Sequence, residues 1–500
     1  MLKIRTVKTA SGATAIQVVQ YHGHHAQVIK HIGSAKTSDQ VAVFTQRAQE
    51  FIKTYTRQSL LFTEPTQKIL FVERSQCIKI SHRFAHDFLL CCLDACGLST
   101  LPTLLRDLTV MRLLEPASKI RSIELLGQYF EVSYSQRFYR TIPKLIRYKS
   151  VIEQGAYKIA TEQFKETLYA VFYDVTTLYF ETFQADEIRV PGFSKDNKPQ
   201  QPQIVVGLLV TQSGFPLAYD VFPGNTFEGK TMLPVIEKFI KDHPQTKPVI
   251  VADAAMLSEE RLAELSQRKL FYIVGARLAN SPTALIQQIH EKLPKNDKAH
   301  ARFSSPHGSV VCDFSVKRYK KDLYEFNKLL EKAKELVAKQ TGGKTRTTFV
   351  KRISKESVVL NEPLVEKRKM LLGIKGYCTN IPEQQLANDK TIDHYHNLWR
   401  IEQTFRMSKH DLQTRPIFHR SEDSIRSHVL ICFTALMVEK YLTLMTKLSL
   451  RDIRSLIWNM TDVHIQDNLT KEIFVFQSPS QQLLNSSLAP LIKQFNLLPH

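Results

Sequence analysis

The sequence predicts an α/β protein in which a central mixed sheet follows a small β-meander and an α-helical region. Three patterns indicate this fold. Residues 166–276 alternate apolar strand-like runs with amphipathic helices, residues 81–165 are helical in periodicity almost throughout, and the first 33 residues alternate as β-strands do. With 500 residues, 43% of them hydrophobic, the chain is long enough for more than one packed domain.

The same patterns predict the organisation of the chain into domains. The N-terminal region begins with strands in "TAIQVVQY" and "AQVIKHIG" and continues with a helix in "SDQVAVFTQRAQEFIKTY". The insertion has strands in "HGSVVCDFSVKRY" and "EKRKMLLGIKGYCTN", with a Lys- and Glu-rich helix between them. The predicted regions are a β-meander plus helix (1–70), an α-helical region (71–165), an α/β domain (166–276 and 390–447), a mixed α/β insertion within that domain (277–389) and a C-terminal region (448–500).

The charge of the chain favours a polyanionic partner. Sixty-eight Lys and Arg residues against 48 Asp and Glu residues give a formal net charge of +20. Basic side chains recur between apolar positions in the helices of residues 81–165, as in helical modules that read DNA. A basic surface without function, and a solvated helical bundle in 81–165, are the alternatives.

Other classes of protein are disfavoured. The N-terminus "MLKIRTVKTASG" lacks the apolar core of a signal peptide, and the longest apolar run, "VLICFTALMV", is far shorter than the roughly 20 residues that span a bilayer. We therefore expect a cytoplasmic protein with no membrane partner. Seven cysteines are few for this length and indicate reduced thiols. The segment "FLLCCLDACGL" predicts a buried helix, not a zinc site.

Two acidic residues stand where the sheet is predicted. Asp174 interrupts the apolar strand "LYAVFYDVTTLYFE", where a carboxylate costs several kcal/mol unless something pairs with it. Asp253 follows the short buried strand "PVIVA", at the carboxyl end, where ligands gather in α/β sheets. Both positions are therefore candidates for function.

A third acid lies on a helix predicted over residues 391–412. At about 100° per residue, Tyr395, Glu402 and Lys409 fall within roughly 40° of one another, and Arg406 joins the same stripe. An apolar stripe lies beside it, made of Leu398, Ile401, Phe405 and Leu412. This arrangement suits the wall of an active site. A surface helix with an ordinary Glu402–Arg406 pair is the alternative.

The motifs "YDVTTLYFE" and "VIVADAAM", followed by Tyr395, Glu402 and Lys409, resemble the DDE transposases of bacterial insertion sequences. More narrowly, they resemble the insertion-sequence-four superfamily, whose signature is Tyr, two residues, Arg, three residues, Glu, six residues, Lys. The segments "GFPLAYDVFPGNTFEGKTMLPVI" and "RPIFHRSEDSIRSHVLICFTAL" are also similar to this family, so the resemblance covers roughly residues 166–440. The signature arginine is Leu398 here, and Arg400 is rotated about 200° from it on a regular helix.

The resemblance implies a ribonuclease-H-like sheet in which Asp174, Asp253 and Glu402 hold two Mg²⁺ (or Mn²⁺) ions. It implies cleavage at the inverted-repeat ends of an insertion sequence and strand transfer into target DNA. It further implies a homodimer on double-stranded DNA in a prokaryotic cytoplasm, associated with the nucleoid. Tyr395, Arg406 and Lys409 would contact the DNA, and residues 71–165 would recognise the ends.

Two alternative functions remain open at this point. One is a ribonuclease-H-like nuclease or resolvase without strand transfer, and the other is a catalytically inert DNA-binding protein. Asp220, Glu228 and Glu181 are either auxiliary ligands or solubilising acids. Trp399 either stacks on a displaced base or packs half-buried.

Overall fold

The structure is a computed structural model that describes residues 2–55, 73, 75–193, 198, 200–254, 258–338, 348–353, 358–478 and 481–497. The chain divides into two compact units. One comprises Met1–Gln76 with Asp467–Glu472, and the other comprises Cys77–Gln466 with Ile473–His500.

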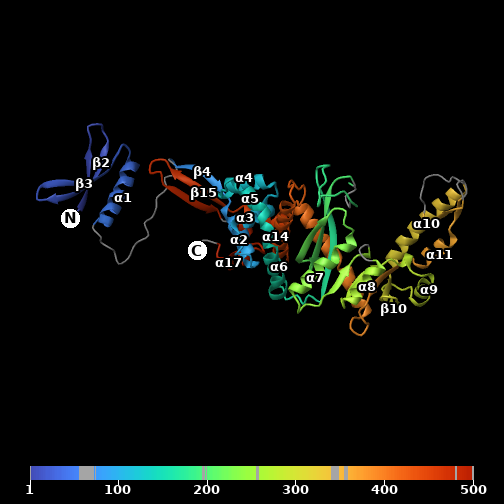
Figure 1. The fold of residues 1–500 in the computed structure, drawn as a ribbon. Coiled ribbons are helices and arrows are strands. Elements are labelled where there is room, and N and C mark those ends of the chain that lie inside the picture. Colours follow the sequence, from blue (N-terminus) through green and yellow to red (C-terminus); the bar gives the residue numbers. More distant parts are fainter. Residues whose placement is uncertain are drawn as a thin grey trace. The chain divides into compact units, whose positions relative to one another are not determined.

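The first unit contains the predicted β-meander and helix. Its strands are β1 (Leu2–Lys8), β2 (Thr14–His22) and β3 (His25–Ala35), which pair in order and antiparallel. Helix α1 (Ser38–Tyr55) covers the residues predicted for it and packs on the sheet (Figure 1, blue). Alternate residues of β2, Ile16 and Val18, form a small core with Ala35 and Ala48, as the period of a half-buried strand requires.

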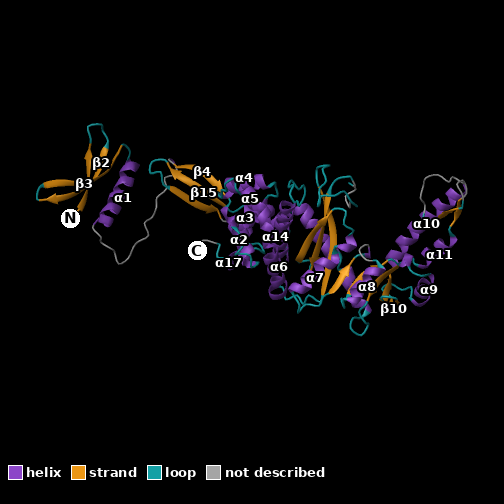
Figure 2. Cartoon of the chain, viewed as in Figure 1, coloured by secondary structure: helices purple, strands orange, loops and turns teal. Residues whose placement is uncertain are grey.

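A mixed eight-stranded sheet is the centre of the second unit, in the order β10-β11-β14-β9-β8-β5-β6-β7. Strand β5 pairs antiparallel with β6 and parallel with β8, and β6 pairs antiparallel with β7. Strands β5 and β6 are continuous apolar runs because both of their faces are covered. The bounds of this half of the sheet are β5 (Ala170–Tyr179), β6 (Gln203–Val210), β7 (Pro216–Pro223), β8 (Val249–Ala252) and β9 (Tyr272–Ala276). Helices α7 (Met232–Asp242) and α8 (Glu259–Gln267) connect its strands (Figure 2).

The segment 277–389 contributes three strands to the same sheet. Strands β10 (His300–Ser305), β11 (Gly308–Phe314) and β14 (Ile374–Thr379) extend it antiparallel beyond β9. The predicted strand in "EKRKMLLGIKGYCTN" is wrong in its first half. There α11 (Glu362–Met370) forms because Asn361 caps it and Pro363 occupies its first turn. The remaining elements of this segment are α9 (Thr283–Lys292), α10 (Val316–Ala338), β12 (Val350–Arg352) and β13 (Val358–Leu360).

The predicted helical region surrounds one long helix, α14 (Glu422–Thr446), in the second unit (Figure 1). Its helices are α2 (Arg83–Ala95), α3 (Thr103–Leu114), α4 (Lys119–Phe130), α5 (Phe138–Thr141), the 3₁₀ helix η2 (Ile142–Tyr148), α6 (Lys149–Lys158) and the π-helical η3 (Ile159–Gln163). One continuous hydrophobic core joins these helices to the sheet, so cutting the chain at residue 165 would expose apolar surface. As predicted, Cys92 and Cys96 are buried in and just after α2, and burial raises the pKa of both thiols.

Helix α14 is long and apolar enough to cross a membrane by length and composition, but 83% of its most apolar window is buried inside the protein. That burial is typical of the core helix of a folded domain. After α14 come α15 (Leu450–Trp458), capped by Ser449, and the strands β15 (Thr461–Asp467) and β16 (Ile473–Ser478), which form a small sheet with β4 (Ser75–Ser81). The chain closes with α16 (Gln481–Leu484) and α17 (Ala489–Gln494).

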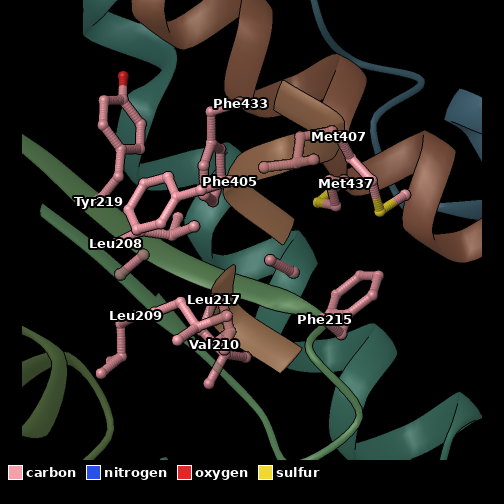
Figure 3. Packing of buried hydrophobic residues seen from close by; sticks show 14 of the residues in the cluster. Leu208, Leu209, Val210, Phe215, Leu217, Tyr219, Phe405, Met407, Phe433 and Met437 are labelled. Atoms are coloured by element: carbon pink, nitrogen blue, oxygen red, sulfur yellow. The ribbon is translucent and has the colours of Figure 1, made fainter. Parts of the chain in front are cut away.

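A helical segment packs on the sheet and carries Glu402, the third predicted acid. Figure 3 shows Phe405 and Met407 among side chains of β6 and β7 on one side and Phe433 and Met437 of α14 on the other. The segment is built from α12 (Asn388–His396), α13 (Trp399–Arg406) and the π-helical η7 (Met407–Asp411). Its apolar anchors hold α13 against β5, because Ile401 and Phe405 are buried in the shared core.

One carboxyl group is buried within this core and is expected to make stability depend on pH. Glu439 in α14 is 1% exposed, and its acidic neighbour is Asp411. Burial, and then the charge of Asp411, raise the pKa of Glu439 to about 8. An acid whose pKa rises on folding contributes stability that is present below the unfolded pKa and is lost as the pH rises through the folded pKa.

We therefore predict that Glu439→Gln removes a loss of stability that wild type suffers between pH 5 and pH 8. The difference in unfolding free energy between variant and wild type should grow in favour of the variant by on the order of 2–4 kcal/mol over that range. Urea unfolding of both proteins at pH 5 and at pH 8 measures this difference in unfolding free energy. Glu291→Gln, at an exposed position of α9, is the control. Parallel pH profiles for wild type and Glu439→Gln would contradict the assignment.

Candidate active site

The two predicted acids of the sheet lie side by side. Strands β5 and β8 are parallel neighbours, and their register pairs Tyr173 with Ala252. Asp174 and Asp253 occupy the next position along each strand, so the two side chains leave the sheet on the same face. Asp174 is half-buried within β5, whereas Asp253 is exposed one residue beyond the end of β8.

A backbone amide donates a hydrogen bond to one oxygen of each carboxylate. Oδ1 of Asp174 accepts a hydrogen bond from the amide of Val175 at 2.7 Å, and Oδ1 of Asp253 accepts one from the amide of Ala254 at 2.7 Å. Each of these contacts fixes the direction of one carboxylate oxygen. Carboxylate oxygens are the kind of donor that Mg²⁺ prefers, and here one acid lies within β5 and the other just beyond the end of β8.

Tyr395 of α12 is a direct partner of Asp253. Its hydroxyl donates to Oδ1 of Asp253 at 3.0 Å, and its ring packs against Tyr377 with centroids 4.9 Å apart. Burial, followed by the charge of Asp253, raises the pKa of Tyr395 above its ordinary value, so the hydroxyl stays protonated and remains a donor. Gly275 of β9 makes this approach possible, because a Cβ at that position would lie 2.5 Å from the Tyr395 hydroxyl oxygen.

Glu402 of α13 lies near the same group. It is exposed, and its helix packs on β5. Its negative charge acts together with that of Asp253 to raise the pKa of Tyr395. Within the described residues, however, no three His, Cys, Asp or Glu side chains are grouped closely enough to hold a metal ion together. Asp174 and Asp253 fit such a role by position and chemistry, and Glu402 lies near Tyr395, the hydrogen-bond partner of Asp253.

Two cations at this site were missed by sequence reasoning. Lys375 of β14 extends its ammonium over the ring of Tyr395, 4.5 Å from the centroid. Burial and the charge of Arg318 lower the pKa of Lys375, whereas the charges of Asp313, Asp253 and Glu402 oppose that shift. A signal for Lys375 did exist, because it interrupts the apolar strand "GIKGYC" as Asp174 interrupts its own strand. Arg318 begins the long helix α10 and offered no comparable pattern.

The single regular helix predicted over residues 391–412 is wrong. The structure has a turn at Asn397–Leu398 between α12 and α13, and a π-helical turn from Met407 to Asp411. Contacts from other elements stabilise this irregular end. Arg454 donates to the carbonyl oxygen of Asp411 at 2.8 Å, and Arg112 donates to that of Gln413 at 3.3 Å. The predicted apolar stripe is nevertheless buried, with Leu398, Ile401, Phe405 and Leu412 all in the core.

These irregularities separate the residues of the predicted polar stripe. Tyr395 is buried beside Asp253, Glu402 and Arg406 are exposed, and Lys409 is half-buried. Lys409 lines a cavity with Thr176, two residues along β5 from Asp174, and with Phe405. Lys409 therefore stands over the Asp174 face of β5, although not on one straight stripe with Tyr395 and Glu402.

The structure shows what surrounds the residues that depart from the expected signature. Leu398, at the position of the family arginine, is 8% exposed at the turn before α13. Arg400 places its guanidinium over the ring of Trp399, 5.1 Å from the centroid, and Trp399 itself is 50% exposed. Asp220 of β7 pairs with Arg426 at 3.5 Å, so that acid already has a cationic partner.

Similarity to known proteins identifies the family of this chain. The family model of the transposase DDE domain matches residues 166–438, more than half of the chain. No curated protein matches the chain. Among solved structures, a piggyBac transposase synaptic complex with hairpin DNA is 8% identical, with 81% of this chain and 74% of that chain covered and a TM-score of 0.37. A Mos1 transposase paired-end complex with the left transposon end is 12% identical, with 46% and 66% covered and a TM-score of 0.16.

The match to the family model spans every element that carries the two aspartates, Tyr395, Lys375 and Glu402. Because it covers more than half of the chain, this protein belongs to the family of transposases with a DDE domain.

Proposed function

We propose that this transposase cleaves DNA at the inverted-repeat ends of an insertion sequence and transfers the freed 3′ ends into target DNA. The observation that carries the proposal is the placement of Asp174 and Asp253 on adjacent parallel strands, with Tyr395 bonded to one of them. We assign Asp174, Asp253 and Glu402 as the catalytic acids of a ribonuclease-H-like domain. The narrower assignment to the insertion-sequence-four superfamily is part of the same proposal.

Transposases of this family generally use divalent metal ions. Asp174 and Asp253 would hold them, together with Glu402 of α13, which packs on β5. Bound Mg²⁺ or Mn²⁺ would activate a water or 3′-hydroxyl and stabilise the leaving oxygen. Such chemistry requires no covalent nucleophile from the protein.

The protein's own residues have the following roles in this proposal. The Tyr395 hydroxyl holds one oxygen of Asp253 in a fixed direction, which leaves the other oxygen for a ligand. Lys375 offsets part of the negative charge of Asp253 and Glu402. Arg406 and Lys409 contact phosphates near the scissile bond, and Tyr395 borders the DNA at the same place.

The partners follow from the proposed chemistry. The net charge of +20 favours binding to the backbone phosphates of double-stranded DNA. Residues 71–165 would recognise the inverted-repeat ends, and two copies of the chain would hold two ends together as a homodimer. A nuclease or resolvase without strand transfer and an inert DNA-binding protein are the other candidates. Only strand transfer yields products in which the 3′ ends are joined to a second DNA. Such products would therefore distinguish the proposed transposase from a nuclease or resolvase and from an inert DNA-binding protein.

Within this proposal, the first prediction concerns the three acids. Asp174→Asn, Asp253→Asn and Glu402→Gln should each abolish Mg²⁺-dependent cleavage of end DNA, because metal ligands act as a unit. Binding of the same DNA should persist. Cleavage is measured on a duplex carrying the inverted repeat that flanks the gene. Glu181→Gln, at an exposed position just after β5, is the matched control and should cleave normally. Near-normal cleavage by any of the three variants would remove that residue from the site.

The second prediction concerns the positioning role of Tyr395. Tyr395→Phe keeps the ring packed and removes the hydrogen bond to Asp253. Loss of an outer partner of a metal ligand typically weakens metal binding by about 10–100-fold. The half-saturating Mn²⁺ concentration for cleavage should therefore rise by about tenfold or more.

Tyr377→Phe is the control for this variant, because Tyr377 packs against Tyr395 but bonds to His396 at 3.0 Å. An unchanged Mn²⁺ requirement in Tyr395→Phe, or an equal rise in both variants, would count against the role assigned to the hydroxyl.

The third prediction concerns phosphate contacts. Arg406→Ala should make the salt dependence of end-DNA binding shallower by about one unit, as for one lost phosphate contact. Arg400→Ala should leave the slope nearly unchanged, because Arg400 is held over Trp399. The affinity of both variants for end DNA, measured across a salt series, tests this prediction. If Arg400→Ala flattens the slope and Arg406→Ala does not, Arg400 replaces the family arginine that is absent at Leu398.

A further inference from the structure

A second cluster of charged side chains lines a cavity formed by residues other than the acids of the sheet. The cavity has a volume of about 130 Å³ and lies where α3, the start of α4, and the segment preceding α14 meet. A single water requires only about 10–15 Å³. The cavity's polar wall consists of Arg112, Lys119, His419 and His428. Its apolar rim consists of Ile120, Tyr139 and Phe418, which are 51%, 49% and 68% exposed.

Lys119 is the deepest cation of this cluster. It is 5% exposed, and its Nζ lies 3.1 Å from Nδ1 of His428. The carbonyl oxygen of Thr414 lies 2.8 Å from Nε2 of His428, and a carbonyl can only accept, so Nε2 carries the ring proton. Nδ1 is then the acceptor for Lys119. The ammonium of Lys119 is therefore bound to a neutral imidazole and not to a carboxylate.

Arg112 supplies a second buried charge. It is also 5% exposed, and its guanidinium donates to the carbonyl oxygens of Ala117 at 2.9 Å and Gln413 at 3.3 Å. Carbonyl groups satisfy these donors but leave the positive charge uncompensated. Within the part of the chain that the structure describes, neither Arg112 nor Lys119 has a carboxylate within 4.0 Å.

The members of the cluster repel one another electrostatically. Burial and then the charge of Arg112 lower the pKa of Lys119 to about 7, and the nearby Cys432 opposes this only in part. Burial, Lys119 and Arg112 together lower the pKa of His419 to about 4 and that of His428 well below its ordinary value. Uncompensated buried cations are costly, and an anion in the cavity would offset the cost.

The N-terminus of α4 also favours an anion in the cavity. Helix α4 begins at Lys119 with Ser118 as its cap, so its N-terminus forms part of the cavity wall. The positive end of a helix dipole stabilises an anion placed there.

We propose that this cavity binds a phosphoryl group, either free phosphate or the terminal phosphate of a DNA strand. Lys119 and Arg112 supply the charge, and the start of α4 supplies backbone donors. The exposed side chains of Ile120, Tyr139 and Phe418 would accommodate a sugar or base attached to that phosphate. The binding of free phosphate does not depend on the proposed cleavage and joining of DNA.

The experiment compares the thermal unfolding of the full-length protein in phosphate, sulfate and chloride at equal ionic strength and at a pH below 7, where Lys119 carries its charge. Phosphate and sulfate should raise the Tm of wild type by about 2 °C or more above chloride. Lys119→Met should lose this shift, and in chloride it should be at least as stable as wild type, because it removes an unpaired buried cation. Lys144→Met, at an exposed position in η2, is the matched control and should keep the shift.

A second measurement identifies the source of the phosphate. Duplex DNA with 5′-phosphate ends is compared with the same duplex carrying 5′-hydroxyl ends, with free phosphate as competitor. A preference for 5′-phosphate of about tenfold in wild type and Lys144→Met, absent in Lys119→Met, assigns the cavity to a DNA terminus. Equal affinity for both ends, with the thermal shift present, assigns it to free phosphate.

The proposal is overturned if wild type shows no preference for phosphate and sulfate over chloride. It is also overturned if Lys119→Met retains the whole shift. Should the variant fail to fold, a wild-type shift that saturates at low millimolar phosphate supports the site, because the general stabilising effect of these anions does not saturate there. Loss of DNA cleavage in the variants of Asp174 or Asp253 would not affect either outcome.

Discussion

Asp174 and Asp253 place two negative charges at neighbouring positions of one sheet, and much of the surrounding structure serves to hold them there. Parallel pairing of β5 and β8 fixes their register, and backbone amides orient one oxygen of each. Two like charges this close repel each other, so a nearby cation stabilises the arrangement. Lys375 supplies one such charge from β14, and a divalent ion would supply more.

The segment 277–389 takes part in this arrangement. Its strands extend the sheet beyond β9, and β14 brings Lys375 over the ring of Tyr395. Its helix α10 brings Arg318 close enough to lower the pKa of Lys375. The residues that separate the second aspartate from Glu402 in the sequence therefore form part of the wall around the site. The cationic cavity at Lys119 and Arg112 shows the opposite imbalance, with buried positive charge and no acid within ion-pair distance among the described residues.

Local patterns were enough to predict much of the fold. The apolar runs of β5, β6 and β8, the meander of β1 to β3 and the helix α1 follow from periodicity, because burial of their faces depends on few distant contacts. Asp174 and Asp253 were found because a charge in an apolar strand and an acid at the end of a strand are visible in the sequence. Their roles as metal ligands stay predictions.

Other features depend on contacts that no local pattern contains. The turn at Leu398 and the π-helical turn before Leu412 are stabilised by Arg112 and Arg454, which come from distant parts of the chain. The strand predicted from Glu366 onward overlaps the second half of α11 because the cap of that helix, Asn361, lies outside the predicted run. Arg318 could not be found, since only the packing of α10 brings it near Tyr395.

The central claim is that Asp174 and Asp253 share a divalent metal ion. Anomalous scattering from crystals of the protein grown with Mn²⁺ and end DNA tests it most directly. The account predicts a Mn²⁺ peak within ligand distance, about 2.1 Å, of a carboxylate oxygen of each aspartate, with Glu402 drawn to the same ion. A well-ordered site with DNA bound and no Mn²⁺ between Asp174 and Asp253 would contradict it.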